Sequence, residues 1–273
     1  MFMTSFSRRC IAGWAISWLA LTPFPAAAQA APALQTVHVP YVRDPVDKSY
    51  RKMNAGMQRF ERERTLAPHA ALRFRLLPRL PNARMEGISL RVAGDSLSLP
   101  ITLDQDLSFV LPRSEQALRQ DAAVVANRRS DSLTWRAWVR SPGLAPGTRR
   151  LGDLRLECRV GMDAGLVSNT SKLFGWLTNI LTDTDKVCNS ADGNYLFFAE
   201  RPLFGVTLQS GMRRESLPFR YLYAGGELDK ASLPFCDCQV LLDRSYYAPL
   251  WDLSWPDDTI LSFEYMDEPG VAP

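Results

Sequence analysis

A two-residue alternation of apolar and polar side chains runs through the middle of the chain, and it constrains the fold more than any other feature. It recurs in short stretches separated by turn residues: Leu72–Leu76, Ile88–Val92, Leu97–Ile101, Leu107–Leu111, Ala122–Asn127, Leu133–Arg140 and Leu154–Val160. Side chains of a strand point alternately to its two faces, so each stretch predicts a strand with one buried face. Their spacing predicts an antiparallel β-sandwich over residues 72–160 and a mainly β protein.

Within this region, the segment Val92–Pro112 resembles a known type of domain. It contains a Gly94-Asp95 turn, alternating apolar residues, the acidic turn Asp104–Asp106, and then Phe109. This order resembles the central hairpins of transthyretin-like, or carboxypeptidase-regulatory-like, β-sandwiches, although the acidic turn lacks their glycine. The resemblance implies a non-enzymatic binding or scaffolding module, and an immunoglobulin-like topology fits almost as well. The whole chain also resembles uncharacterised exported proteins of Gram-negative bacteria, which implies no particular activity.

The first thirty residues show the features that export machinery recognises. Arg8 and Arg9 precede an apolar run, Cys10–Leu21, and small residues follow at Ala26–Ala30. This order predicts a signal peptide over residues 1–30, cleaved after Ala30. The apolar run is shorter than the roughly 20 residues that a membrane-spanning helix needs. The general secretory route is favoured over the twin-arginine route. We therefore expect a periplasmic or secreted protein with no transmembrane anchor after cleavage.

The mature chain is predicted to begin with an arm and a helix, over residues 31–71. Asp44 and Pro45 form a typical helix start, and the pattern predicts a helix over Pro45–Arg64. The apolar residues on its expected buried face follow one another at steps of four and three: Val46, Tyr50, Met53, Met57 and Phe60. Because this spacing repeats with the helical turn, the helix is expected to be amphipathic.

Residues 161–273 are predicted to form a second, α+β part that is rich in strands. A helix capped by Ser168 or Asn169 is expected first, with its apolar face at Leu173, Phe174, Leu177, Ile180 and Leu181. Five short apolar stretches follow: Tyr195–Ala199, Leu203–Leu208, Phe219–Tyr223, Gln239–Leu242 and Ile260–Tyr265. Glycine and proline pairs separate them, so strands and loops are expected here.

The two parts of the mature chain carry opposite net charge. Residues 31–160 contain 22 Lys and Arg against 13 Asp and Glu, and residues 161–273 contain 8 against 16. Either each part has its own solvated surface, or the basic part meets an anionic surface such as lipid headgroups or polysaccharide phosphates. Nucleic acid is not expected as a partner, given the predicted export.

Four cysteines remain after cleavage, and an even number in an oxidising compartment favours disulfides. They are Cys158, Cys188, Cys236 and Cys238, which allow three pairings. Cys158 shares strand parity with Leu156 and is expected to point into the core, so a link to Cys188 would tie the two parts together. Cys236 and Cys238 would then form a strained pair or bond elsewhere. Structural disulfides are favoured over a redox role or a zinc site.

The sequence predicts no metal site and no cofactor. His38 and His69 lie far apart in the expected arm and loop, and no serine lies in a hydrolase motif. The acidic loop that begins at Asp183 and ends at Asn194 lacks the residue order of a calcium loop.

Aromatic residues gather in the C-terminal part, where 14 of the chain's 28 Phe, Tyr and Trp lie between residues 195 and 265. Some of these rings interleave with carboxylates, which suits a sugar ring that stacks on aromatic planes while its hydroxyls bind acids. The candidate ligand-binding residues are Tyr246, Tyr247, Trp251, Asp252, Trp255 and Asp257. Packing in the core is the competing and favoured interpretation of these rings.

These features favour a non-enzymatic binding or envelope-accessory module, with a protein or glycan of the cell envelope as its partner. The alternative is a hydrolase of envelope polysaccharide that uses two C-terminal carboxylates flanking the cleaved bond. A deep cavity with two facing carboxylates and raised pKa values would favour the hydrolase.

Overall fold

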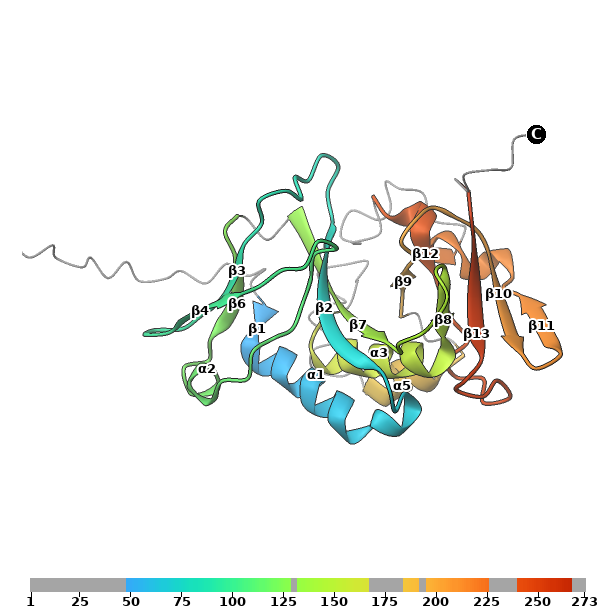
Figure 1. Ribbon diagram of the computed structural model, residues 1–273, viewed down its shortest axis with the longest axis horizontal. Coiled ribbons are helices and arrows are strands. Elements are labelled where there is room, and N and C mark those ends of the chain that lie inside the picture. The colour runs from blue at the N-terminus through green and yellow to red at the C-terminus, as the bar shows by residue number, and fades with distance from the viewer. Residues whose placement is uncertain (1–47, 129–131, 167–183, 192–194, 226–239, 267–273) are drawn as a thin grey trace, which may run out of the picture. The chain divides into compact units, whose positions relative to one another are not determined.

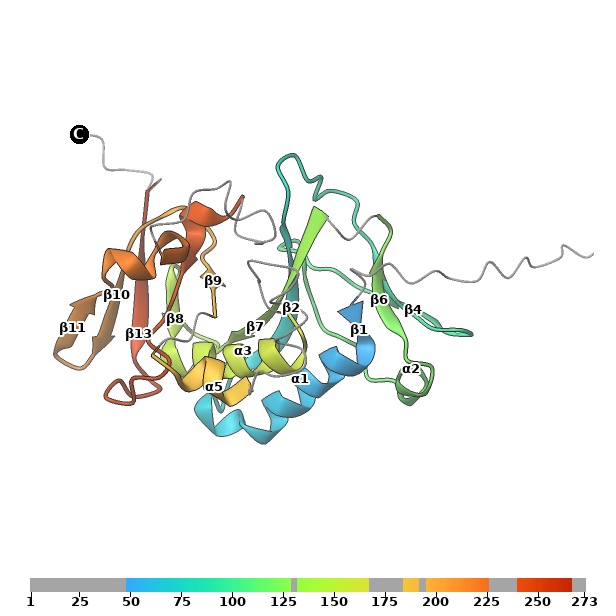
Figure 2. The same cartoon turned by 180° about the vertical axis from the view of Figure 1, so that it is seen from behind.

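The computed structural model describes residues 48–128, 132–166, 184–191, 195–225 and 240–266. The described residues form thirteen strands in several sheets and few helices. Figure 1 shows this mostly β arrangement, and Figure 2 shows it from behind. All described strand pairs are antiparallel. The predicted mainly β, antiparallel character is therefore confirmed. No helix in this part of the chain is long and apolar enough to cross a membrane.

Seven strands from residues 48–140 form two sheets around one core. The first sheet has the order β1-β6-β3-β4 and contains β1 (Lys48–Ser49), β6 (Ala123–Ala126), β3 (Leu90–Ala93) and β4 (Ser98–Ile101). The second has the order β5-β2-β7 and contains β5 (Ser108–Phe109), β2 (Ala71–Pro78) and β7 (Leu133–Arg140). The short helix α2 (Glu115–Arg119) precedes β6. Most of the predicted strands are thus present, but neither sheet closes.

Helix α1 (Tyr50–Arg62) carries the predicted apolar face into this core. Tyr50, Met53 and Met57 are buried, as the four-three spacing predicts. The predicted start at Pro45 is wrong, because residues 48 and 49 form β1 and Ser49 caps the helix. The Ser49 hydroxyl accepts a hydrogen bond from the backbone N–H of Lys52 at 3.4 Å. A short 3₁₀ turn, η1 (Arg64–Leu66), follows the helix.

The predicted strand Leu154–Val160 is wrong, since these residues lie in helix α3 (Leu151–Asp163). The helix is enclosed on nearly all sides, and even Asp153, Arg155 and Glu157 are buried along it. A helix that is buried on all sides has no polar face, so its apolar residues do not repeat with the helical turn. The alternation of apolar and charged residues in this helix therefore resembled that of a strand. The helix also runs across the domain boundary predicted after residue 160.

Glycines let α3 approach its neighbours closely. A side chain at Gly56 of α1 would meet Ala164 Cβ and Val160 O at 2.8 Å. A side chain at Gly161 would meet Tyr195 Oη at 2.1 Å. These contacts place α3 against α1 on one side and against the start of the C-terminal segments on another.

The remaining strands form a second four-stranded sheet and a two-stranded one. The larger has the order β11-β10-β13-β8 and contains β11 (Arg213–Ser216), β10 (Leu203–Ser210), β13 (Ile260–Tyr265) and β8 (Thr148–Arg150). The smaller pairs β12 (Ser245–Tyr246) with β9 (Phe197–Phe198). The stretch predicted at 219–223 instead forms 3₁₀ turns η3 (Phe219–Tyr221) and η4 (Tyr223–Gly225), and η6 (Leu242–Arg244) precedes β12. The helix predicted to follow Ser168 lies outside the described residues.

A disulfide joins Cys158 of α3 to Cys188 of α5 (Thr184–Asn189), with an S–S distance of 2.01 Å. Both cysteines are buried, so the pairing considered from the sequence is confirmed. Cys236 and Cys238 lie outside the described residues.

Candidate functional site

The sheet β5-β2-β7 has two faces of opposite chemistry. One face packs into the core with Phe74, Leu76, Trp135, Ala137 and Val139. The other carries Arg73, Arg75, Arg136, Trp138 and Arg140, which we call the arginine face. Across the strands, Arg73 lies opposite Trp138 and Arg75 lies opposite Arg136. Directly opposed residues of an antiparallel pair share a face, so the register itself gathers these side chains.

Trp138 holds two of the neighbouring guanidinium groups in place. The Cζ atom of Arg75 lies 5.1 Å from the centre of the indole ring, and that of Arg149, from β8, lies 4.4 Å from it. Each such cation–π contact stabilises by about 0.5–2 kcal/mol, depending on its exposure. Contact with the indole ring therefore fixes the orientation of the guanidinium groups of Arg75 and Arg149.

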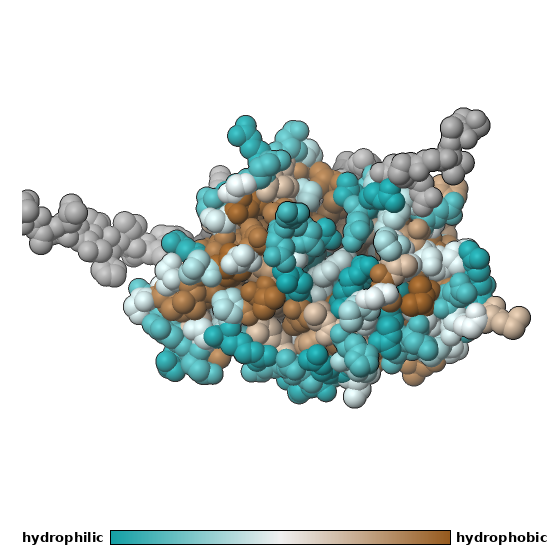
Figure 3. All heavy atoms as spheres, viewed as in Figure 1, coloured by the Kyte–Doolittle hydropathy of each residue, from teal (hydrophilic) through white to brown (hydrophobic). Residues whose placement is uncertain are grey.

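Trp138 lines three cavities beside this face, and the smallest of them, about 10 Å³, lies among Arg140, Arg149 and Tyr265. The outer cavity has a volume of about 500 Å³ and lies among His69, Arg73, Arg140 and the loop 141–144. The inner cavity, of about 50 Å³, is lined on its polar side by Arg75, Arg136, Arg244, Glu157 and Glu200. In the space-filling view, a hydrophilic band runs down the middle of the molecule near β2, between apolar patches (Figure 3).

All three arginines that line the inner cavity bind backbone carbonyl groups. Arg75 Nε donates to Asp106 O at 3.0 Å, and Arg244 Nη1 donates to Glu200 O at 3.0 Å. Arg136, which is buried, donates to the carbonyls of Leu166 and Leu196. A carbonyl satisfies a donor but carries no net charge, so these bonds leave the positive charge of the guanidinium groups in place.

Beneath this face, Arg149 and Glu157 form a buried ion pair. Arg149 Nη2 lies 2.7 Å from Glu157 Oε2, and the two side chains are 2% and 5% exposed. The same carboxylate oxygen accepts from the backbone N–H of Val139 at 2.9 Å. Burial is the largest single influence on the pKa of Arg149 and acts to lower it, but the charge and hydrogen bond of Glu157, with Tyr246 and Asp153, together outweigh burial, so the pKa is raised.

A second acid of α3 binds the backbone just after β7, at the strand edge that faces away from β2. Asp153, fully buried, accepts hydrogen bonds from the backbone N–H and the hydroxyl of Ser141, both at 2.7 Å. An unpaired strand edge exposes backbone donors, and Glu157 and Asp153 satisfy two of them here. These carboxylates therefore hold the sheet that carries the arginine face.

The acidic turn Asp104–Asp106, which follows β4, binds an arginine that lines the outer cavity. Arg73 binds the carboxylate of Asp104 and donates to Ser108 Oγ at 2.8 Å. Burial of Asp106 acts to raise its pKa, but hydrogen bonds from Ser108 and the charges of Arg75 and Arg73 outweigh it. The pKa of Asp106 is therefore lowered, and its carboxylate stays charged.

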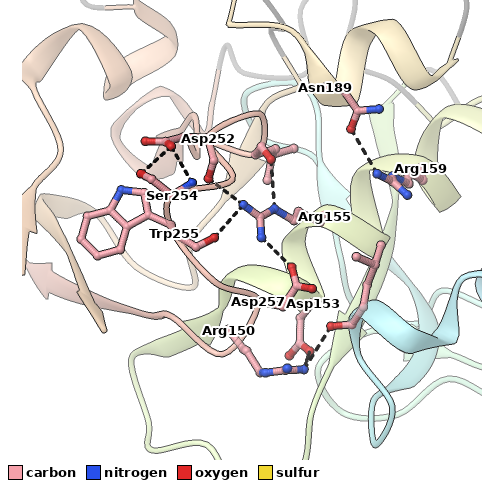
Figure 4. Close-up of polar contacts among 11 residues, drawn as sticks. Arg150, Asp153, Arg155, Arg159, Asn189, Asp252, Ser254, Trp255 and Asp257 are labelled. Carbon is pink, nitrogen blue, oxygen red and sulfur yellow. Dashed lines mark hydrogen bonds and ion pairs between the residues drawn. The ribbon is translucent and has the colours of Figure 1, made fainter. Parts of the chain in front are cut away.

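The predicted ligand-binding segment near the C-terminus surrounds a single buried arginine of α3 (Figure 4). Arg155 donates to the carbonyls of Leu250, Asp252 and Trp255 at 2.8–3.0 Å. Its Nη1 atom also lies 2.5 Å from Asp257 Oδ1. One side chain thus fixes the course of residues 250–257, and the carboxylate of Asp257 belongs to this structural contact.

The six predicted residues do not form one exposed surface. Tyr246 is fully buried, and Trp255 is 3% exposed with Arg213 Cζ 3.6 Å from its ring centre. Tyr247 is partly buried, and this burial raises the pKa of its hydroxyl group. The side chain of Trp251, in contrast, is exposed. Core packing of Tyr246 and Trp255 accords with the interpretation that the sequence favoured.

Asp252, also among the predicted residues, accepts hydrogen bonds from the hydroxyl and the backbone N–H of Ser254 at 2.6 and 3.0 Å. These bonds, with the charges of Arg213 and Arg155, lower its pKa despite some burial. A ligand role for this segment stays a prediction.

Within the described ranges, no group of three or more His, Cys, Asp and Glu side chains could hold a metal ion. Asn189 accepts from Arg159 Nη2 at 3.1 Å. His69 is exposed and lies at the rim of the outer cavity, and also of a mostly apolar cavity of about 560 Å³ between α1 and β2. His38 lies outside the described residues.

Sequence reasoning missed Trp138, Arg75, Arg140 and Arg244 as site residues. The signal for the first three was present, because arginines alternate with apolar residues along both β2 and β7. The approach of Arg244, more than 100 residues further on, left no comparable signal. No protein-family model, no curated protein and no solved structure matches this chain.

Proposed function

We propose that this chain is an exported, non-enzymatic binding module of the cell envelope, with its ligand in the outer cavity on the arginine face. The observation that carries the proposal is the placement of Trp138. Its ring lines the cavity of about 500 Å³ beside Arg73 and Arg140, and it also lines the smaller cavity, where it contacts Arg75. Cationic side chains therefore lie next to a space that accommodates part of a ligand. Preorganised donors lose little entropy on binding, which favours affinity.

The carboxylates favour binding over catalysis. A glycoside hydrolase needs an acid whose pKa is raised toward the working pH, facing a second carboxylate. The pKa values of Asp106 and Asp252 are both lowered, and Asp153, Glu157 and Asp257 are bound in structural contacts. A polysaccharide hydrolase, the second candidate, draws less support from these residues.

Export draws support from the leader pattern and from the disulfide. The order of charge, apolar run and small residues in the first thirty positions is that of a signal peptide. Cys158 and Cys188 form a buried disulfide, which is typical of proteins that fold in oxidising compartments. A ligand of the envelope, either a glycan or an acidic protein surface, matches both this compartment and the charge of the site.

The experiment is a binding assay with the natively exported protein. Immobilised peptidoglycan, lipopolysaccharide and capsular polysaccharide serve as ligands, and biolayer interferometry measures the dissociation constants. Trp138→Ala and Arg140→Gln are expected to weaken binding at least about tenfold, since each removes a charge-assisted or orienting contact. Trp251→Ala, which removes an exposed ring outside both cavities, serves as the matched control and is expected to bind normally.

Circular dichroism of each variant verifies that it is folded, and Arg140→Gln keeps the test valid if Trp138→Ala unfolds. Loss of binding in Trp251→Ala together with normal binding in Arg140→Gln would refute the proposed site. Release of reducing sugar ends from any of the polysaccharides would favour the hydrolase instead.

A further inference from the structure

We infer that the ligand carries a phosphate or carboxylate group, and that this oxyanion lies in the inner cavity between Arg75 and Arg244. The inference rests on the proposed function and specifies the chemistry of the ligand that it requires. Both arginines line the inner cavity, and they come from separate parts of the chain, β2 and η6. An oxyanion between them would join these parts through hydrogen bonds.

The two arginines have donors to spare. A guanidinium group has five N–H donors and no acceptor, so it can bind only an oxygen or another acceptor. Among the described residues, Arg75 uses its Nε atom and Arg244 uses its Nη1 atom, each for one carbonyl. Arg244 Nε is buried and has no hydrogen-bond partner in the part of the chain that the structure describes. A buried donor without a partner is unfavourable, and an acceptor bound beside it would satisfy it.

The sizes of the cavities divide the ligand into two parts. A cavity of about 50 Å³ holds roughly four water-sized groups, which suits the oxygens of one phosphate or carboxylate group. A sugar ring or a peptide residue is too large for it. The outer cavity, about 500 Å³, shares the lining residue Trp138 with the inner one and has room for the rest of the ligand. Its lining contains neutral residues, among them Ala71, Pro142 and Leu144.

The charges around the inner cavity favour an anion over a neutral group. Its two glutamates each have an arginine partner outside its lining: Glu157 binds Arg149 at 2.7 Å, and Glu200 lies 4.0 Å from Arg140. Arg75, Arg136 and Arg244 add positive charge to these pairs. Guanidinium groups bind phosphate and carboxylate through parallel hydrogen bonds, a geometry that neutral hydroxyls do not match. We therefore expect an anionic ligand whose charged group lies innermost.

Isothermal titration calorimetry with four small probes tests the inference: inorganic phosphate, acetate, glucose 6-phosphate and glucose. Glucose 6-phosphate is expected to bind more tightly than inorganic phosphate, because its ring reaches the outer cavity. If the natural group is a carboxylate, acetate is expected to bind more tightly than inorganic phosphate. Equal affinity for inorganic phosphate and glucose 6-phosphate would identify a free oxyanion as the ligand. Each of these results supports the inference, whereas equal affinity for glucose and glucose 6-phosphate overturns it.

The variants localise the site. Arg75→Gln and Arg244→Gln are each expected to weaken binding of the preferred anion at least about tenfold. Arg214→Gln, which removes the same charge from exposed strand β11, is expected to change the affinity less than about twofold. Equal weakening in all three variants would overturn the inference, since it would indicate a general effect of net charge. If polysaccharide binding still depends on Arg140 while none of the anions binds, the inference fails and the proposed function stands.

Discussion

Replacing Glu157 by glutamine tests how the arginine face is supported. Glu157 Oε2 accepts one bond from Arg149 and one from the backbone of Val139. Glutamine has nearly the same shape and still offers an oxygen to Val139, but it removes the negative charge. Arg149, of which only 2% of the side chain is exposed, is then left as a buried cation without its carboxylate.

The expected cost follows from this burial. Removing one partner of a buried ion pair destabilises a protein by about 3–5 kcal/mol, because the remaining charge is still desolvated. An exposed pair is worth about 0–1 kcal/mol. Arg51 and Asp121 form such a pair at 3.5 Å, with side chains 63% and 55% exposed. Arg51→Gln is therefore the matched control, and the two variants should differ by several kcal/mol.

Urea unfolding followed by circular dichroism measures this difference. At an m-value of about 2–3 kcal/mol per molar urea, Glu157→Gln should lower the midpoint by about 1–2.5 M. The double variant Arg149→Met, Glu157→Gln should be more stable than Glu157→Gln alone, since it also removes the buried charge. A loss below about 1 kcal/mol in Glu157→Gln, or a double variant less stable than the single one, would refute this reasoning.

Three further outcomes follow from the structure. Replacing Cys158 and Cys188 together by alanine should cost about 3–4 kcal/mol, because the bond closes a loop of 30 residues. Reductant should lower the stability of the unmodified protein by at least as much, and a protein equally stable in urea with and without reductant would contradict the assignment. Burial raises the pKa of Tyr195 from 10.0 to about 12 despite the nearby charge of Arg136. The neutral hydroxyl therefore contributes its full stability below pH 10, and this contribution is lost as the pH rises toward 12. Tyr195→Phe should flatten the alkaline decline in the free energy of unfolding, and an unchanged decline would count against this assignment. Gly161→Ala should destabilise by about 1–3 kcal/mol, because the added methyl group meets Tyr195 Oη, and differential scanning calorimetry should detect the lowered Tm.

The sequence predicted strands well where one face is buried and the other is polar. β2 is the clearest case, since Phe74 and Leu76 alternate with arginines and the structure separates the two sets. α3 was misread because burial on all sides removes the contrast between faces on which the helical period depends. The start of α1 was placed too early because Asp44 and Pro45 match a capping pattern that Ser49 fulfils instead.

The candidate site could be predicted only in part. The arginine face follows from the alternation within β2 and β7 once their register is known, but register depends on pairing over about 60 residues. The inner cavity needs Glu200 and Arg244 beside Arg75, and such contacts between distant segments leave no pattern in a single sequence. Conversely, the aromatic and acidic residues near Trp255 looked like a surface, whereas Arg155 draws their backbone inward.

Anomalous diffraction from crystals soaked in selenate tests the central claim most directly, because selenate is a tetrahedral, doubly charged oxyanion whose selenium can be located. The account predicts an anomalous peak in the inner cavity, within hydrogen-bond reach of Arg75 and Arg244, and no such peak in crystals of Arg244→Gln. Selenate bound only at other arginines, with the inner cavity filled by water, would contradict it.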